Sequence, residues 1–173
     1  MSEDKQQEEY RSSLMLLEHI SKEYDKEDLR ASKIESRIPI FITIVTFFGG
    51  FIFSFGGKDL TSIYNKGYKI YSLYIIIYIA CVVMLLIALG VFIWILCSKK
   101  YMRINIELFS AKSINNERVE KSAYELIRGY QEVLKNNIKI NDIKIKQYNI
   151  GIGLLVGSTI LYLLIQILNF IIS

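Results

Sequence analysis

Uncharged polar and small residues recur along one face of two segments that are otherwise apolar. In the later segment they are Ser158, Tyr162, Gln166 and Asn169, and in the earlier one they are Thr43, Thr46, Gly50 and Ser54. Residues three and four positions apart lie on one face of a helix. Each set therefore predicts a polar stripe, which either holds helices together by hydrogen bonds or lines a water-filled pathway.

Both interpretations of the stripes stay open on the sequence. In the first, the stripes and the small-residue pair Gly153-x-x-x-Gly157 pack two helices together within one monomer. In the second, a homo-oligomer, which we take as a tetramer, surrounds a pore, and Gln166 and Asn169 line its outer half. Because neither segment contains Asp, Glu, Lys, Arg or His, such a pore would select little among ions, and proton-coupled transport or voltage sensing is not expected.

A series of basic residues between positions 112 and 139 also has two interpretations. They are Lys112, Arg118, Lys121, Arg128, Lys135 and Lys139. Residues 1–37 carry a net charge of −3 and residues 99–146 one of +5, so these charges either pair in a helical bundle or remain solvated. The alternative is a basic surface for anionic lipid or for a nucleotide ligand. Binding of duplex DNA is not expected.

The sequence contains no set of residues with the spacing of a catalytic or metal centre. His19 is the only histidine, and there is no Ser/His/Asp set, metal-ligand cluster or glycine-rich phosphate loop. Cys81 and Cys97 share one apolar run and would lie about 24 Å apart along a helix, beyond disulfide reach. We therefore predict that the protein is not an enzyme and binds no cofactor or metal.

The sequence has three long runs without charged residues, and the first and third of them carry the stripes. They cover residues 38–57, 70–98 and 147–173, and each is long enough to cross the roughly 30 Å apolar core of a bilayer as a helix. We predict transmembrane helices at 38–57, 70–98 and 149–173, with an external connector at 58–69. Residues 1–37 and 99–148 are the predicted cytoplasmic helical segments. The expected fold class is therefore an all-α integral membrane protein, with these two segments forming a bundle.

Both cytoplasmic segments show the spacing of amphipathic helices. The stripe positions are Tyr10, Leu14, Leu17, Ile20 or Ser21, and Tyr24 in the first, and Val119, Ala123, Leu126 or Ile127, Tyr130, Leu134 and Ile138 in the second. Residues 139–146 alternate as a strand would, but we expect a helix that continues into the third span, because a lone strand beside lipid leaves its backbone unpaired. Pro39 either kinks the junction with the first span or lies in its first turn.

Basic residues near the ends of the spans predict the orientation in the membrane. They are Arg30, Lys33 and Arg37 before the first span, Lys99, Lys100 and Arg103 after the second, and Lys139, Lys144 and Lys146 before the third. In a three-span protein these flanks share one side. The N-terminus is therefore expected in the cytoplasm and the C-terminus at the outer surface.

Two local patterns resemble those of the SLATT-type effectors, small membrane proteins of bacterial nucleotide-signalling anti-phage systems. One is the charged segment from Glu27 to Arg37 that runs directly into a span. The other is Asn141-x-x-Lys144 before the last span, with Tyr148 and Gly151 on the same face. The third span departs from the minimal two-span form of that family.

The resemblance implies an oligomeric effector in the bacterial inner membrane. It would depolarise that membrane after phage infection and cause growth arrest or death, controlled by a nucleotide or oligonucleotide from a companion nucleotidyltransferase. Two other functions remain open: a non-conducting immunity protein that binds a toxin, and a membrane anchor whose cytoplasmic helices recruit a soluble partner.

Overall fold

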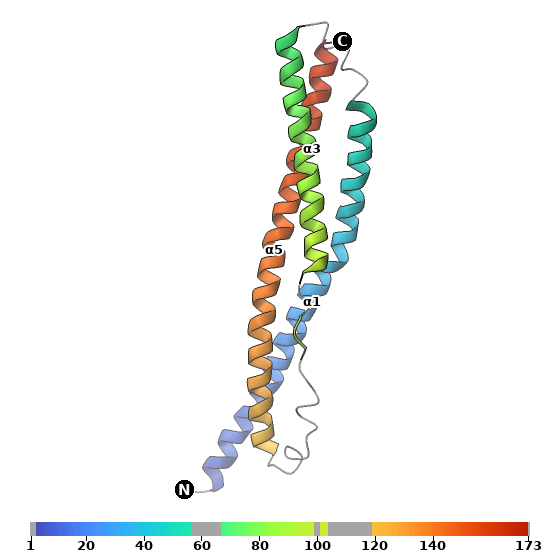
Figure 1. Cartoon of the computed structure of the whole chain (residues 1–173). Helices are drawn as coiled ribbons and strands as arrows, with labels where there is room; N and C mark the ends of the chain where they lie inside the picture. The colour runs from blue at the N-terminus through green and yellow to red at the C-terminus, as the bar shows by residue number, and fades with distance from the viewer. Residues whose placement is uncertain (1–2, 57–66, 99–100, 104–118, 173) are drawn as a thin grey trace. The chain divides into compact units, whose positions relative to one another are not determined.

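Three long α-helices make up the regular structure of the residues that the computed structural model describes, which are 3–56, 67–98, 101–103 and 119–172. They are α1 (Glu3–Gly56), α3 (Tyr68–Cys97) and α5 (Val119–Ile172) (Figure 1). Each contains a stretch long and apolar enough to cross a membrane. The predicted all-α architecture is confirmed for the described residues, and three helices long and apolar enough to span a membrane suggest a multi-pass membrane protein.

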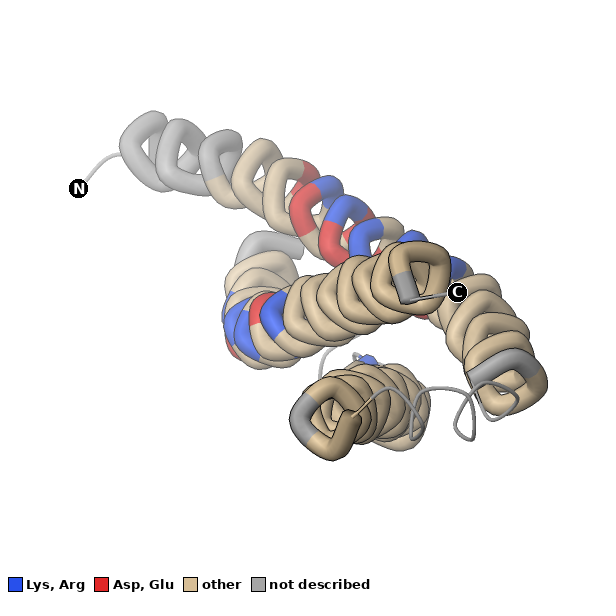
Figure 2. The backbone as a smooth tube through the Cα atoms, turned by 90° about the horizontal axis from the view of Figure 1, so that it is seen from above, with Lys and Arg blue, Asp and Glu red and all other residues tan. Residues whose placement is uncertain are grey.

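Two of the helices continue without a break from a charged part into an apolar part. α1 and α5 contain 54 residues each, and Figure 2 shows that Lys, Arg, Asp and Glu gather in one part of each helix. The prediction that residues 139–146 are helical is confirmed. Pro39 lies in the interior of α1, where its missing N–H leaves one carbonyl of the preceding turn without its helical partner.

Buried and half-buried positions in all three helices alternate at spacings of four and three residues. In α1 they include Ala31, Ile34, Ile38, Phe41, Val45, Phe48 and Ile52; in α3 Tyr74, Tyr78, Cys81, Leu85, Ala88, Phe92 and Ile95; in α5 Asn137, Asn141, Lys144, Tyr148, Gly151, Leu155, Ser158, Tyr162 and Ile165. A repeat of 3.5 residues is the pattern of left-handed coiled-coil packing. Within each unit the helices therefore pack along faces with this repeat, which we call seams.

The chain divides into two compact units. Unit 1 comprises Met1–Lys33 and Lys99–Ile143, and unit 2 comprises Ile34–Ser98 and Lys144–Ser173. Unit 2 has the larger apolar core, in which Ile38, Phe92 and Ile165 are fully buried. Unit 1 contains the first part of α1, the first part of α5 and residues 101–103, which have no regular secondary structure. We call residues 101–103 the strap.

The start of α3 explains part of the predicted external connector. Gly67 precedes the helix with a φ of 130°, a conformation that side chains other than that of glycine rarely adopt. Its carbonyl accepts a hydrogen bond from the N–H of Tyr71 at 3.1 Å. The helix α3 therefore begins at Tyr68, while residues 58–66 of the predicted connector lie outside the described part of the chain.

Candidate functional site

Unit 1 buries two asparagines of α5 where a coiled-coil seam normally has apolar side chains. Asn137 is 4% exposed and Asn141 is fully buried. The sequence pattern placed Ile138 on this face, but Ile138 is 37% exposed. The seam advances by 3.5 residues on average, so it passes from Leu134 to Asn137 and leaves Ile138 beside it. A polar pair at these positions is the clearest departure from ordinary packing in unit 1.

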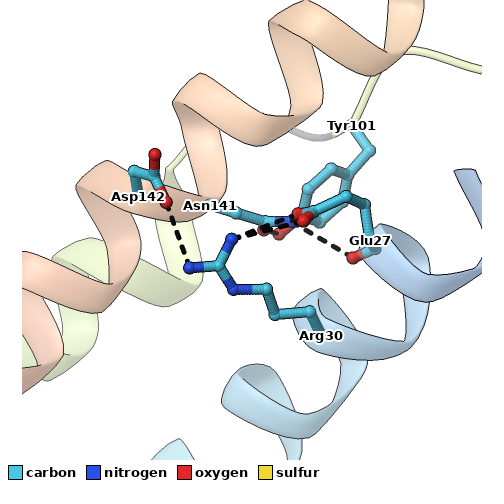
Figure 3. Close-up of polar contacts among 5 residues, drawn as sticks. All are labelled: Glu27, Arg30, Tyr101, Asn141 and Asp142. Atoms are coloured by element: carbon cyan, nitrogen blue, oxygen red, sulfur yellow. Dashed lines mark hydrogen bonds and ion pairs between the residues drawn. The ribbon is translucent and has the colours of Figure 1, made fainter. Parts of the chain in front are cut away.

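Asn141 joins three parts of unit 1 through its side-chain amide (Figure 3). Its Oδ1 accepts a hydrogen bond from the hydroxyl of Tyr101 in the strap. Its Nδ2 donates to the backbone carbonyl of Glu27 in α1 at 3.1 Å and to Glu27 Oε2 at 2.7 Å. Both ends of the amide are therefore bonded, as a buried polar group requires.

Charged groups extend the hydrogen-bonded cluster around Asn141, which we call the junction, toward solvent. Arg30 donates to Glu27 Oε1 at 3.3 Å within α1 and to Asp142 Oδ1 at 3.1 Å on α5 (Figure 3). The Arg30 and Asp142 side chains are 41% and 53% exposed, so this ion pair contributes well under about 1 kcal/mol. The sequence predicted that acidic side chains of the first segment pair with basic side chains of the second, whereas in this ion pair α1 supplies the basic residue.

Asn137 holds the strap by pairing with its backbone. Its Oδ1 accepts from the N–H of Met102 and its Nδ2 donates to the carbonyl of Met102, both at 3.1 Å. The side-chain amide thus bonds both polar groups of one strap residue, as a neighbouring strand would. Each such hydrogen bond contributes a net stabilisation of about 1 kcal/mol.

In unit 2, the next seam residue of α5 is a buried lysine. The Lys144 side chain is 3% exposed, and its Nζ lies 2.8 Å from Glu35 Oε1 on α1, whose side chain is 46% exposed. A buried ammonium group is costly unless it is paired and hydrogen-bonded. The sequence analysis used Lys144 as a charge at the membrane end, whereas the structure assigns it to the packing of α1 against α5.

The polar stripe of the third span faces the interior of unit 2. Ser158 and Tyr162 are buried, while Gln166 and Asn169 are half-buried. The Ser158 hydroxyl donates to its own helix at Leu155, and its carbonyl accepts from the Cys81 thiol of α3 at 3.2 Å. The Tyr162 ring meets Phe51 of α1 edge-on, with centroids 6.2 Å apart. This geometry is that of helix packing within one chain.

The polar stripe of the first span points away from the interior of unit 2. Thr43, Thr46, Gly50 and Ser54 are all exposed. The Thr43 hydroxyl donates to the Pro39 carbonyl at 3.0 Å, and the Thr46 hydroxyl donates to the Ile42 carbonyl at 2.9 Å. The two predicted stripes therefore do not face each other, and the α1 stripe is available to lipid or to another molecule.

The close approach of helices in unit 2 is centred on Gly151 rather than on the predicted glycine pair. A Cβ atom on Gly151 would lie 2.8 Å from the Phe92 ring, and Phe92 also stacks on Phe41 with centroids 5.5 Å apart. A Cβ on Gly153 would meet nothing within 4 Å, and one on Gly157 would meet only the flexible end of Met84. Gly151 is therefore the glycine that packing requires.

The predicted basic surface is only partly within the described residues. Arg128, Lys135 and Lys139 are exposed on α5. Lys112 and Arg118, together with the side chain of Lys121, lie outside the described part of the chain. A groove of about 420 Å³ in unit 1 is lined by other residues, namely Leu14, Leu17, Glu18, Ser21, Leu126 and Tyr130.

Two aromatic rings contact each other between α1 and α5 in unit 1. The rings of Tyr24 and Tyr130 meet edge-on, with centroids 5.7 Å apart. Burial, and next the Asp28 carboxylate, raise the pKa of the Tyr24 phenol above its usual value. Since the folded state favours the neutral phenol, Tyr24 stabilises unit 1 below about pH 10, and this contribution is lost as the pH rises further.

Within the described ranges, no group of three or more His, Cys, Asp or Glu side chains is arranged to hold a metal ion. Comparison of the chain with models of protein families, with curated proteins and with solved structures found no match.

Proposed function

We propose that the chain is a bacterial inner-membrane protein that assembles as a homo-oligomer and opens a gated pore. The observation that carries the proposal is the exposed face of α1 formed by Thr43, Thr46, Gly50 and Ser54. Lipid chains cannot form hydrogen bonds with hydroxyl groups, whereas water in a pathway between copies can form them with uncharged polar side chains. Of the two spans that carry a polar stripe, this exposure favours the first over the third as the lining of the pore.

The packing of unit 2 supports a pathway between copies rather than through one copy. Its core is filled by Ile38, Val45 and Phe92, each with no exposed surface. A ring of copies related by a rotation axis is the usual way for such small units to enclose a pore. Gly50 supports close approach by a second copy, because a Cβ there would meet nothing within 4 Å in its own chain.

The physiological part of the proposal rests on the resemblance to SLATT-type effectors. We infer that opening depolarises the membrane after phage infection and arrests growth, under the control of a nucleotide or oligonucleotide signal. The exposed cations Arg128, Lys135 and Lys139 on α5 support such a signal, because phosphate groups are attracted to clustered basic side chains.

Ion flux from proteoliposomes, with depolarisation in expressing bacteria, tests the pore. Thr46→Trp should lower the flux by about tenfold or more, because a bulky ring obstructs a narrow pathway. Leu163→Trp, at a position 56% exposed on α5, is the matched control and should leave the flux unchanged. The absence of flux and depolarisation under all activating conditions, together with a monomeric mass in detergent, would overturn the proposal.

A non-conducting role is the second candidate, and the hydroxyl bonds within α1 favour it. Because Thr43 and Thr46 donate to carbonyls of their own helix, they can face lipid without a second copy. The chain would then be an immunity protein or a membrane anchor for a soluble partner. This role predicts no flux, tolerance of Thr46→Trp and Gln166→Leu, and either protection against a co-expressed toxin or partner binding by residues 99–148.

A further inference from the structure

We propose that the charged end of unit 2 binds anionic phospholipid, and that Arg37 of α1 and Lys146 of α5 hold the phosphate groups of the lipid. We call these two residues the border cations. The inference goes beyond the proposed pore, because it requires that the helices span a membrane but not that the chain conducts. It is carried by the position of the border cations, by their charge and by the apolar side chains beside them.

The border cations lie at the same height on two parallel helices. Two contacts in unit 2 fix the register of α1 and α5. Glu35 Oε1 lies 2.8 Å from Lys144 Nζ, and the ring centroids of Phe41 and Tyr148 are 5.4 Å apart. Each border cation lies two residues beyond the first contact, which is about 3 Å along the helix axis. No charged residue follows either of them in its helix, so both mark the start of the uncharged part.

The charge of the border cations is not balanced within the described part of unit 2. The charged residues of unit 2 with described side chains are Glu35, Arg37, Lys144 and Lys146. Their sum is +2, and the one carboxylate lies 2.8 Å from the buried Lys144 ammonium. Asp142, one turn before Lys146 on α5, accepts a hydrogen bond from Arg30. Both border cations are exposed, and basic residues at a membrane border attract anionic headgroups.

Exposed apolar side chains continue from each border cation into the uncharged part of its helix. Ile40 is 59% exposed and lies three residues after Arg37, and Ile150 is 57% exposed and lies four residues after Lys146. Residues at these spacings share one face of a helix, and long basic side chains extend from apolar surface to the headgroup level. A phospholipid therefore fits better than free phosphate, because its phosphate can meet a cation while an acyl chain covers the isoleucine.

Quenching of tryptophan fluorescence by brominated lipids measures which lipids lie on this surface. Trp94 is the only tryptophan of the chain, so Trp94→Phe/Ile150→Trp places a single reporter one turn from Lys146. The full-length variant is reconstituted in phosphatidylcholine vesicles that contain dibrominated phosphatidylcholine or dibrominated phosphatidylglycerol, and the two quenching curves give the relative affinity for the anionic lipid. Trp94→Phe/Ile160→Trp is the matched control, because Ile160 is 53% exposed on α5 and lies ten residues further into the uncharged part.

The reporter at position 150 should show an affinity for phosphatidylglycerol about fivefold or more above that for phosphatidylcholine, and the reporter at position 160 should show no preference. Arg37→Gln/Lys146→Gln should lower the preference at position 150 to about twofold or less. Arg128→Gln removes an exposed cation of unit 1 and should leave the preference unchanged. Lys146→Gln alone should lower it in part, and keeps the test valid if the double replacement does not fold.

Equal preferences at positions 150 and 160, or a preference that survives removal of both border cations, would overturn the lipid site. Loss of the preference on addition of millimolar glycerol phosphate would show a site for soluble phosphate and would overturn it as well.

Discussion

At the scale of single residues, amide and ammonium groups occupy seam positions of α5 that usually carry apolar side chains. Asn141 makes three hydrogen bonds from a fully buried site. Polar groups at isolated seam positions fix the register of packed helices at a cost in stability. In this chain they fix the register of α5 against α1 in unit 1, and they also bind the strap.

Asn141→Ala should lower the free energy of unfolding by about 2–4 kcal/mol. The substitution removes the three hydrogen bonds of the Asn141 amide, and each contributes a net stabilisation of about 1 kcal/mol. Asn136→Ala, on the same helix and only half-buried, should change it by less than about 0.5 kcal/mol. Denaturant unfolding in detergent, followed by circular dichroism, compares the two. Equal effects would show that the junction does not stabilise unit 1.

Glu35→Gln should destabilise unit 2 because it removes the carboxylate charge that lies 2.8 Å from the buried Lys144 ammonium. Breaking a fully buried pair costs about 3–5 kcal/mol, and the 46% exposure of Glu35 reduces the expected loss to about 1–2 kcal/mol. The double variant Glu35→Gln/Lys144→Met removes the ammonium charge of Lys144 as well. Its thermal unfolding midpoint should recover toward that of the parent, and a midpoint lower than in the single variant would contradict this account.

At the scale of helices, one glycine permits the contact between α3 and α5 in unit 2. Gly151 lies beneath the Phe92 ring, and the Tyr148 ring is 6.3 Å from Phe92, centroid to centroid, and 5.4 Å from Phe41. These three aromatic rings fill the space that a side chain at position 151 would otherwise occupy.

Gly151→Ala should destabilise the protein by about 1–3 kcal/mol, the usual cost of overpacking a core. The added methyl group would meet an aromatic ring that is itself stacked on Phe41 and cannot easily move. Gly153→Ala adds the same group in open space and should be neutral or slightly stabilising, since alanine favours helix. Unfolding midpoints of the two variants in the same detergent test this. A larger loss of stability for Gly153→Ala than for Gly151→Ala would instead support the close contact predicted from sequence at Gly153 and Gly157.

The helices were predictable from sequence, but the junction was not. Runs without charge identify spanning helices because a bilayer excludes charged groups. In contrast, Asn137 and Asn141 look like solvated residues in a charged segment, and only the register of the seam reveals that they are buried. Tyr101 lies in a segment without periodicity, so nothing local indicates its partner 40 residues away. The resemblance did single out Asn141, Lys144, Tyr148 and Gly151, all of which lie on the seam.

At the scale of the whole molecule, the charge distribution predicts the orientation of the chain in the membrane. The described helices concentrate their charges in one part of α1 and one part of α5 (Figure 2), and basic residues near membrane ends favour the cytoplasm. The exposed residues Arg128 and Tyr68 lie on opposite sides of the membrane if the predicted topology holds.

Cysteine labelling in intact cells tests this orientation. In the Cys97→Ser background, Tyr68→Cys should react with a membrane-impermeant maleimide added outside, because position 68 begins the second span. Arg128→Cys should react only after the cells are permeabilised. The reverse pattern would invert the orientation, and labelling of both positions from outside would contradict three spans.

The exposed polar face of α1 is the basis of the proposed pore, and water access to that face tests it most directly. The measurement is the reaction of Thr46→Cys, in the Cys97→Ser background in proteoliposomes, with a charged methanethiosulfonate that cannot enter lipid. Because thiols react as thiolates, which form in water and not in hydrocarbon, the account predicts reaction and loss of ion flux at position 46. Leu163→Cys, at an exposed apolar position of α5, should not react. Failure of Thr46→Cys to react while the protein is conducting would contradict a pathway lined by α1.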